Sequence, residues 1–205
     1  MTTSPNQLID GPAGALEALF TKPDSPARAL AVICHPHPQF GGTMDNKVVQ
    51  TLAKAFAELG FATMRFNFRG VGNSAGVFDD GIGETEDAAA ALAWAKAQLP
   101  ASIPLVAAGF SFGCFVQTRL LPRSQPQQLV LVGPAVNRFT IAEVAKDTIV
   151  IHGEDDDVVP LADVMNWARP QGLPVTVFPG TGHFFHGRLT ELKTVIKRNV
   201  SITSQ

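Results

Sequence analysis

Hydrophobic residues follow two different spacings along this chain. Short runs of β-branched and small apolar residues, typical of buried strands, alternate with stretches in which apolar residues recur at the spacing of a helix face. The runs predict strands at 29–34, 61–66, 105–108, 129–132, 148–151 and 175–178. The helical stretches cover 45–59, about 84–99, a segment from 114, a segment from about 161, and a last one with Leu189, Leu192, Ile196 and Val200 on one face. This alternation predicts an α/β fold, with a mostly parallel central sheet and helices on both faces.

The N-terminal segment predicts a different pairing. Residues 7–10 and 15–20 flank Gly11-Pro12-Ala13-Gly14, a turn-forming sequence, which indicates an antiparallel hairpin at one edge of the sheet. No repeat, low-complexity tract or linker interrupts the rest of the chain. We therefore expect residues 1–205 to form one domain, which is large enough to bury a core without disulfides or a metal.

Composition narrows the class of partner. The formal net charge is −2 and acids and bases are interspersed, so the sequence offers no basic stripe for nucleic acid and no polybasic patch for a membrane. A small molecule is the expected partner. The N-terminus lacks the features of a signal peptide, no apolar run approaches the length of a membrane span, and the two cysteines, Cys34 and Cys114, suit a reducing compartment. These features predict a cytoplasmic protein and leave its oligomeric state open.

The sequence Gly109-Phe110-Ser111-Phe112-Gly113 places a serine between two glycines. A predicted strand, 105–108, comes directly before it and a predicted helix begins at Cys114. This is the context of a nucleophile elbow, a sharp strand-to-helix turn that exposes a serine hydroxyl and leaves no room for flanking side chains. Ser111 is therefore the candidate nucleophile, although a serine in a glycine-rich loop is more often only part of a turn.

A serine hydroxyl needs a base to take its proton, and the base needs a carboxylate to hold its tautomer. Strand 148–151 leads into His152-Gly153-Glu154-Asp155-Asp156-Asp157, and strand 175–178 leads into Pro179-Gly180-Thr181-Gly182-His183. Loops at the carboxyl ends of parallel strands meet at the edge where the elbow also lies. From the residues alone, any of the three consecutive aspartates could be the acid, and an acidic run is often only a solvated surface. A metal site is the lesser interpretation, because one short acidic run lacks a full ligand set.

Further motifs give the chain a family resemblance. With a serine, a carboxylate and a histidine in this chain order, nearly the whole chain resembles the α/β-hydrolase superfamily. Within it, the chain resembles small hydrolases related to dienelactone hydrolase, which share its segments His35-Pro36-His37-Pro38 and Arg65-Phe66-Asn67-Phe68-Arg69-Gly70-Val71-Gly72-Asn73-Ser74. That resemblance implies that Asp156 is the acid and His183 the base, and it implies no cofactor. Dienelactone hydrolase itself uses a cysteine nucleophile, so its substrate does not transfer to a chain with Ser111.

Oxyanion stabilisation requires two backbone N–H donors near the nucleophile. One is expected from Phe112, directly after Ser111. The other is expected from the loop after strand 29–34, where proline lacks an N–H; His37 is the candidate and Gln39 the fallback. The alternative that His35 and His37 bind zinc lacks a third ligand in the sequence.

Two loops near the predicted site have plainer interpretations. Gly70-Val71-Gly72 lacks the third glycine of a dinucleotide site and the lysine of a P-loop, so it predicts a structural turn. Arg69 beside it has either a structural role or a contact with an anionic substrate. Only residues 133–147 separate strand 129–132 from the next strand, which leaves no room for a cap domain and predicts an open site.

The combined prediction is a serine hydrolase that cleaves small carboxylic esters or thioesters through an acyl-enzyme on Ser111, with no cofactor and no metal. Two alternatives stay open. A non-catalytic α/β-hydrolase scaffold would bind a ligand or a protein, because fold alone does not guarantee chemistry. An acyltransferase or amidase would use the same residues on a different acceptor or bond.

Overall fold

The computed structural model describes residues 2–3 and 6–202, and residues 1, 4–5 and 203–205 of the predicted domain lie outside this part. Its strands are β1 (Thr2–Thr3), β2 (Gln7–Gly11), β3 (Gly14–Lys22), β4 (Leu30–Cys34), β5 (Ala62–Phe66), β6 (Leu105–Phe110), β7 (Gln128–Val132), β8 (Ile149–Gly153) and β9 (Val175–Phe178). Its α-helices are α1 (Lys47–Glu58), α2 (Ile82–Ala97), α3 (Phe112–Ser124), α4 (Leu161–Ala168) and α5 (Leu189–Asn199). Two short 3₁₀ turns, Pro38–Phe40 and Arg169–Gln171, complete the described elements.

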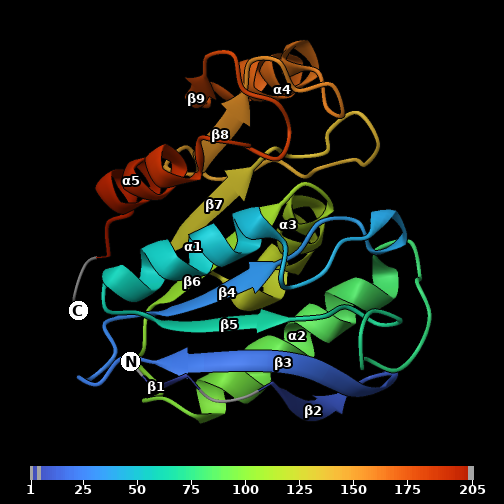
Figure 1. Ribbon diagram of the computed structural model, residues 1–205, viewed down its shortest axis with the longest axis vertical. Coiled ribbons are helices and arrows are strands. Elements are labelled where there is room, and N and C mark those ends of the chain that lie inside the picture. Colours follow the sequence, from blue (N-terminus) through green and yellow to red (C-terminus); the bar gives the residue numbers. More distant parts are fainter. Residues whose placement is uncertain (1, 4–5, 203–205) are drawn as a thin grey trace.

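The strands form one sheet in the order β1-β3-β5-β4-β6-β7-β8-β9, with β2 paired to β3 (Figure 1). From β5 to β9 every neighbouring pair is parallel, while β3 runs antiparallel to β5. The predicted hairpin is confirmed, since β2 and β3 pair from Gln7 opposite Ala18 to Gly11 opposite Gly14. The predicted fold class is therefore confirmed, and the carboxyl ends of the parallel strands lie at one edge.

Helices cover both faces of this sheet. The apolar faces of α1 and α5 pack on one side, in a cluster that includes Phe56, Phe110 and Ile196. The helices α2 and α3 pack on the other side, in a cluster that includes Phe68, Phe112 and Leu120 (Figure 1). Strands β4 and β6 are buried along their whole length, as expected for strands covered on both faces.

Most elements differ from the sequence-based prediction by one or two residues at an end, and two of these differences bear on the site or its neighbourhood. Helix α1 begins at Lys47 rather than at Asp45, because the Asn46 side chain caps it by accepting from the Val48 N–H at 2.9 Å. Asp45 instead lies 3.1 Å from the Arg65 guanidinium. Strand β8 extends two residues further than predicted, so His152 lies within the strand.

The connections at the carboxyl edge are short. Residues 133–147, between β7 and β8, contain no helix or strand, which agrees with the predicted absence of a cap domain.

Cys34 and Cys114 are buried free thiols. In the part of the chain that the structure describes, no helix has the length and hydrophobicity needed to span a membrane.

Candidate active site

Ser111 lies at the tight turn between β6 and α3. Its backbone has φ 56° and ψ −117°, a strained conformation for a residue with a side chain. A Cβ on Gly109 would lie 2.5 Å from the Gly113 backbone, and a Cβ on Gly113 would lie 2.2 Å from the Cys34 carbonyl oxygen. Both flanking glycines are therefore required by close backbone approach, as the elbow pattern predicts. The buried Gln117 side chain fixes α3 to the sheet by donating to the carbonyls of Val32 and Ala108.

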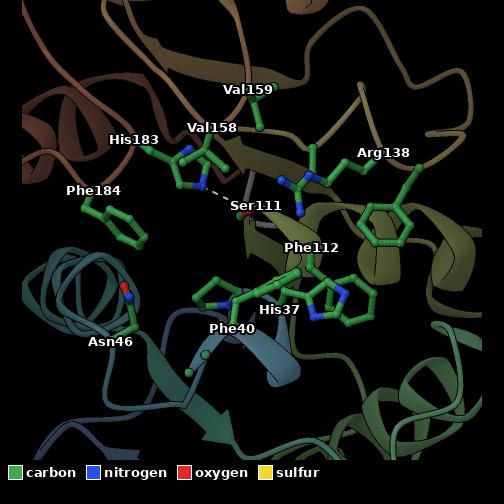
Figure 2. A pocket seen from close by; sticks show the side chains of 15 residues that line it. His37, Phe40, Asn46, Ser111, Phe112, Arg138, Val158, Val159, His183 and Phe184 are labelled. Atoms are coloured by element: carbon green, nitrogen blue, oxygen red, sulfur yellow. Dashed lines mark hydrogen bonds between the residues drawn. The ribbon is translucent and has the colours of Figure 1, made fainter.

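A hydrogen-bonded chain joins three of the predicted site residues. The Ser111 Oγ lies 3.0 Å from His183 Nε2 (Figure 2). His183 Nδ1 in turn lies 2.6 Å from Asp156 Oδ2. All three residues are buried, with only 7 % of Ser111 exposed. Because Asp156 has no proton to give at neutral pH, Nδ1 carries the proton, and Nε2 is left as the acceptor for the serine hydroxyl. This is the arrangement that general-base activation of a serine requires.

The aspartate of this chain is the middle one of the acidic run. Its second oxygen, Oδ1, accepts from the N–H groups of Val158 at 3.0 Å and Val159 at 2.7 Å. Burial raises the pKa of Asp156, but the His183 hydrogen bond and charge, the Val159 N–H and the charge of His152 outweigh burial and hold that pKa below its usual value. Asp155 and Asp157 are exposed, and neither side chain contacts His183. The geometry therefore selects Asp156 among the three aspartates.

His152 contacts the same carboxylate from inside β8. Its Nε2 lies 2.8 Å from the Val159 carbonyl and 3.4 Å from Asp156 Oδ2, and burial is the largest of the effects that lower its pKa. A neutral ring that donates from Nε2 to the Val159 carbonyl holds the turn that carries Asp156. His152 therefore has a structural role beside the site.

The two histidines of the loop after β4 have different environments. His35 is fully buried: Nδ1 donates to the Pro36 carbonyl at 2.6 Å, Nε2 accepts from the Phe68 N–H at 3.0 Å, and burial lowers its pKa to about 3. Both nitrogens are thus occupied, and neither is available to a metal. In the described residues, no three His, Cys, Asp or Glu side chains lie together as a metal site would require.

His37 lies beside Ser111, and its ring centroid is 4.9 Å from that of Phe112. Its Nδ1 accepts from the Gln39 N–H at 3.2 Å, so the amide of Gln39, the fallback oxyanion donor, is already engaged. Within residues 2–3 and 6–202, the backbone N–H groups of His37 and Phe112 donate to no protein atom. These two predicted donors are therefore free to bind an oxyanion.

The segment of residues 65–74 has a structural role. Glu17 of β3 accepts from the side chains of Asn6, Asn67 and Asn73 and from the Asn73 N–H, at 2.8–3.2 Å. The Ser74 hydroxyl accepts from the Glu17 N–H and donates to the Asn67 carbonyl. We call Glu17, Asn67, Asn73 and Ser74 the Glu17 network. It confirms that Gly70-Val71-Gly72-Asn73-Ser74 is a structural turn, in which a Cβ on Gly72 would overlap the Glu17 carboxylate.

Arg69 also has a structural partner. Its guanidinium donates twice to the Asp87 carboxylate, which is fully buried in α2, at 2.8 and 3.0 Å. Its backbone N–H donates to the same carboxylate. Arg69 does not line the cavity next to Ser111. Of the two roles considered for Arg69, the geometry supports the structural one.

A cavity of about 310 Å³ opens beside Ser111 (Figure 2). Its wall is mostly apolar, and it includes Phe112, Phe139, Val158 and the exposed rings of Phe40 and Phe184. Arg138 contributes a charged side chain. Arg138 and Phe139 belong to the segment after β7, which sequence reasoning treated only as too short for a cap. The shortness of this segment could have identified these residues, because a short loop at the carboxyl edge without a cap domain must itself form part of the cavity wall.

Comparison with known proteins agrees with this geometry. The family model for X-Pro dipeptidyl-peptidase (S15 family) matches residues 10–153. A structure described as an α/β serine hydrolase homologue from Coxiella burnetii is 41 % identical, covers 98 % of this chain and 99 % of its own, and has a TM-score of 0.90. A serine hydrolase without a lid from Xanthomonas campestris is 36 % identical, with 100 % and 98 % covered and a TM-score of 0.91. An uncharacterized protein of Rickettsia prowazekii is 32 % identical over 94 % of this chain and 87 % of its own.

These relatives cover the elbow and the loops that follow it, and the predicted membership of the α/β-hydrolase superfamily is confirmed. The absence of a lid over the site is shared with the Xanthomonas structure. The matched family model spans more than half of the chain. The chain therefore belongs to the S15 family of hydrolases and has the architecture of a serine hydrolase without a lid.

Proposed function

We propose that the protein hydrolyses small carboxylic esters or thioesters through an acyl-enzyme on Ser111. The observation that carries this proposal is the unbroken hydrogen-bonded chain from Ser111 Oγ through His183 to Asp156, at the wall of a small and largely apolar cavity. A cavity of about 310 Å³ is at the small end of ligand sites, which suits a short substrate.

In the first half of the reaction, Ser111 Oγ attacks the carbonyl carbon while its proton passes to His183 Nε2. Asp156 keeps the proton of the imidazole on Nδ1 and stabilises the imidazolium that forms. The negative charge that develops on the carbonyl oxygen is held by the free N–H groups of Phe112 and His37. The imidazolium then gives its proton to the leaving alcohol or thiol, the bond from carbon to the leaving group breaks, and the acyl group stays on Ser111.

In the second half, water takes the place of the alcohol. His183 Nε2 accepts a proton from the water as its oxygen attacks the acyl carbon, and the proton returns to Ser111 Oγ when the acyl–serine bond breaks. The carboxylic acid leaves and the starting state is restored. No step requires a cofactor, because each proton is taken and returned by the same imidazole.

Charge at the site favours esters over the dipeptide amides that the family name describes. An enzyme that releases an N-terminal dipeptide has to bind a free ammonium group, for which a carboxylate is the usual partner. None of the described residues that line the cavity is an aspartate or a glutamate. Short esters and thioesters make no such demand. Amide hydrolysis is therefore the weaker candidate for this site.

The proposal is tested by replacing the nucleophile. Ser111→Ala should lower kcat for p-nitrophenyl acetate by about 10⁴-fold or more, because the three residues act as a unit. The matched control is Ser124→Ala at the other end of α3, where the buried hydroxyl has no hydrogen-bond partner among the described residues. The control should keep the parental rate. A panel of esters, thioesters and a proline-containing dipeptide anilide then compares the substrate classes.

A fluorophosphonate probe separates an enzyme from a binding scaffold. It should label the wild-type protein and Ser124→Ala, and should leave Ser111→Ala unlabelled, because only an activated serine reacts. Hydrolysis by Ser111→Ala at the wild-type rate would overturn the mechanism. A wild-type protein that neither reacts with the probe nor cleaves any ester would instead support the non-catalytic scaffold.

A further inference from the structure

Arg138 is the one charged side chain, other than histidine, among the described residues that line the cavity beside Ser111. Its guanidinium lies 5.3 Å from the centre of the Phe40 ring, and Figure 2 shows it extending from the loop after β7 toward Ser111. This position gives a fixed positive charge to a wall that is otherwise mostly apolar. From this geometry we infer that Arg138 binds a carboxylate on the acyl half of the substrate.

The guanidinium of Arg138 lies over an aromatic ring, and no carboxylate among the described residues pairs with it. Its contact with the Phe40 ring, itself 71 % exposed, orients the side chain along the rim without using its N–H groups. In the part of the chain that the structure describes, no carboxylate lies within 4.0 Å of it. Arg69 differs in this respect, since its guanidinium is held by the buried Asp87 carboxylate. The guanidinium N–H groups of Arg138 therefore have no acceptor among the described residues, and their planar fork matches the two oxygens of a carboxylate.

The charge balance of the cavity supports an anionic ligand. Burial lowers the pKa of His37, and the nearby Arg138 charge lowers it further while Asp80 acts in the opposite direction. Asp80 does not line the cavity, and neither does any other acidic residue of the described chain. A bound carboxylate would thus meet an unpaired guanidinium and no fixed negative charge at the wall. An ammonium group would be repelled by that guanidinium and would find no carboxylate among the lining residues.

The position of the proton donor places the Arg138 charge beside the acyl half of the substrate. The leaving oxygen must take its proton from His183 Nε2, so the alcohol half of an ester lies beside His183 and Phe184. In Figure 2, Arg138 and His183 lie on opposite sides of Ser111. The acyl half, which points away from His183, extends toward Arg138. The substrate class that fits is a monoester or monothioester of a short dicarboxylic acid. This inference rests on the proposed esterase function.

The test compares three small esters, with acid release followed by titration at constant pH. Monomethyl glutarate carries the carboxylate on its acyl half, and its isomer 4-acetoxybutanoate carries it on the alcohol half. Methyl 5-methylhexanoate replaces the first carboxylate by an isopropyl group of similar shape. In the wild-type protein, kcat/KM should be about tenfold or more higher for monomethyl glutarate than for either of the others, which is the effect of one charge-assisted pair at a partly exposed site.

Two variants assign that preference to Arg138. Arg138→Met should reduce the ratio of kcat/KM between monomethyl glutarate and methyl 5-methylhexanoate by about tenfold. The matched control is Arg119→Met, since Arg119 is also exposed and also lies over a phenylalanine ring, Phe115, but away from the cavity. The control should keep the wild-type ratio. Added salt should lower the wild-type ratio and leave that of Arg138→Met unchanged, because salt screens an exposed charge pair.

The outcomes separate this inference from the function on which it rests. A wild-type protein that cleaves all three esters at similar rates, or a ratio that Arg138→Met leaves unchanged, overturns the role of Arg138 and leaves the esterase proposal intact. A preference for 4-acetoxybutanoate overturns the acyl-side assignment. A protein that cleaves no ester and whose Ser111 does not react with the fluorophosphonate probe overturns both proposals.

Discussion

Two polar networks, each built on a buried carboxylate, lie at the carboxyl edge of the same sheet, and they differ in what they leave unsatisfied. The first, which we call the Ser111 network, consists of Ser111, His183 and Asp156 and reaches the wall of a cavity. The second is the Glu17 network, in which one carboxylate accepts four hydrogen bonds from protein donors. Both combine side chains that are distant in sequence, and both contain a carboxylate whose pKa is held below its usual value.

The comparison shows how similar polar chemistry leads to different roles. In the Glu17 network the carboxylate is enclosed by amides, and no member of the network lines the cavity. Its hydrogen bonds therefore serve only the structure. In the Ser111 network the serine hydroxyl has the histidine on one side and the cavity on the other. A buried polar network supports a reaction only where one of its atoms meets a space that a substrate can enter. Variants of the two carboxylates should therefore affect different measurements.

The largest effect is expected from Asp156→Asn. An amide at this position favours the wrong tautomer of His183, because it can donate to Nδ1 and so leave Nε2 protonated. We expect kcat to fall by about 10³- to 10⁴-fold for the best ester of the panel. Steady-state kinetics measure this loss, and circular dichroism checks that the fold is kept.

The neighbouring aspartates provide the controls for that prediction. Asp155→Asn and Asp157→Asn change exposed side chains that do not contact His183, so kcat should stay close to the wild-type value. A larger loss of kcat at either neighbour than at Asp156 would reassign the acid. The Ser111 network as described would then be wrong.

An intermediate effect, on stability rather than rate, is expected from Glu17→Gln. The amide replaces one acceptor oxygen by a donor that faces the N–H groups of Asn67 and Asn73. The free energy of unfolding, measured in urea, should fall by about 1–3 kcal/mol, the usual cost of disturbing hydrogen bonds to a buried charge. The value of kcat/KM should stay close to that of the wild type.

The matched control for Glu17 is Glu86→Gln. Glu86 pairs with Arg123 through two hydrogen bonds, but both side chains are about half exposed. Solvent screens such a pair, so the loss of unfolding free energy should stay below about 1 kcal/mol. If Glu17→Gln lowered kcat tenfold without affecting stability, the Glu17 network would belong to the reaction, and the proposed division between the two networks would be wrong.

Sequence alone predicted the fold class and the elbow because each depends on local rules. Alternating hydrophobic periods predicted the strands and helices, and the glycines at 109 and 113 reflect close contacts between backbones. The order of loops along a parallel sheet predicted that Ser111, His183 and one of three consecutive aspartates would meet, since carboxyl ends of strands share an edge. The choice of Asp156 among the three came from the family resemblance. The assignment of roles to these three residues, like the cytoplasmic location, stays a prediction.

The parts that sequence reasoning did not reach depend on contacts between distant segments. Nothing near Glu17 in the sequence indicates that the turn around Asn73 would enclose it, because the two are 56 residues apart. Arg69 and Arg138 both occur in loops beside the predicted site, and periodicity does not separate them. The difference comes from their partners: Asp87 on α2 pairs with the Arg69 guanidinium, whereas the Arg138 guanidinium lies over the Phe40 ring at the cavity wall.

The smallest effect concerns how the stability difference at Glu17 depends on pH. Burial raises the pKa of Glu17, but hydrogen bonds from Asn73, Asn67 and Asn6 outweigh burial and hold the pKa below the usual 4.5. A carboxylate with a lowered pKa contributes stability above its unfolded-state pKa, and that contribution is lost as pH falls through the folded-state value. The gap in unfolding free energy between wild type and Glu17→Gln should therefore be constant from pH 7 to about 5.5 and shrink below about pH 4.5. Urea titrations at several pH values measure the gap, and taking the difference removes the contribution of Asp156, which is present in both proteins. A gap that stays constant down to pH 3 would mean that the loss comes from packing rather than from the ionised carboxylate, and the Glu17 network would no longer be an electrostatic counterpart of the Ser111 network.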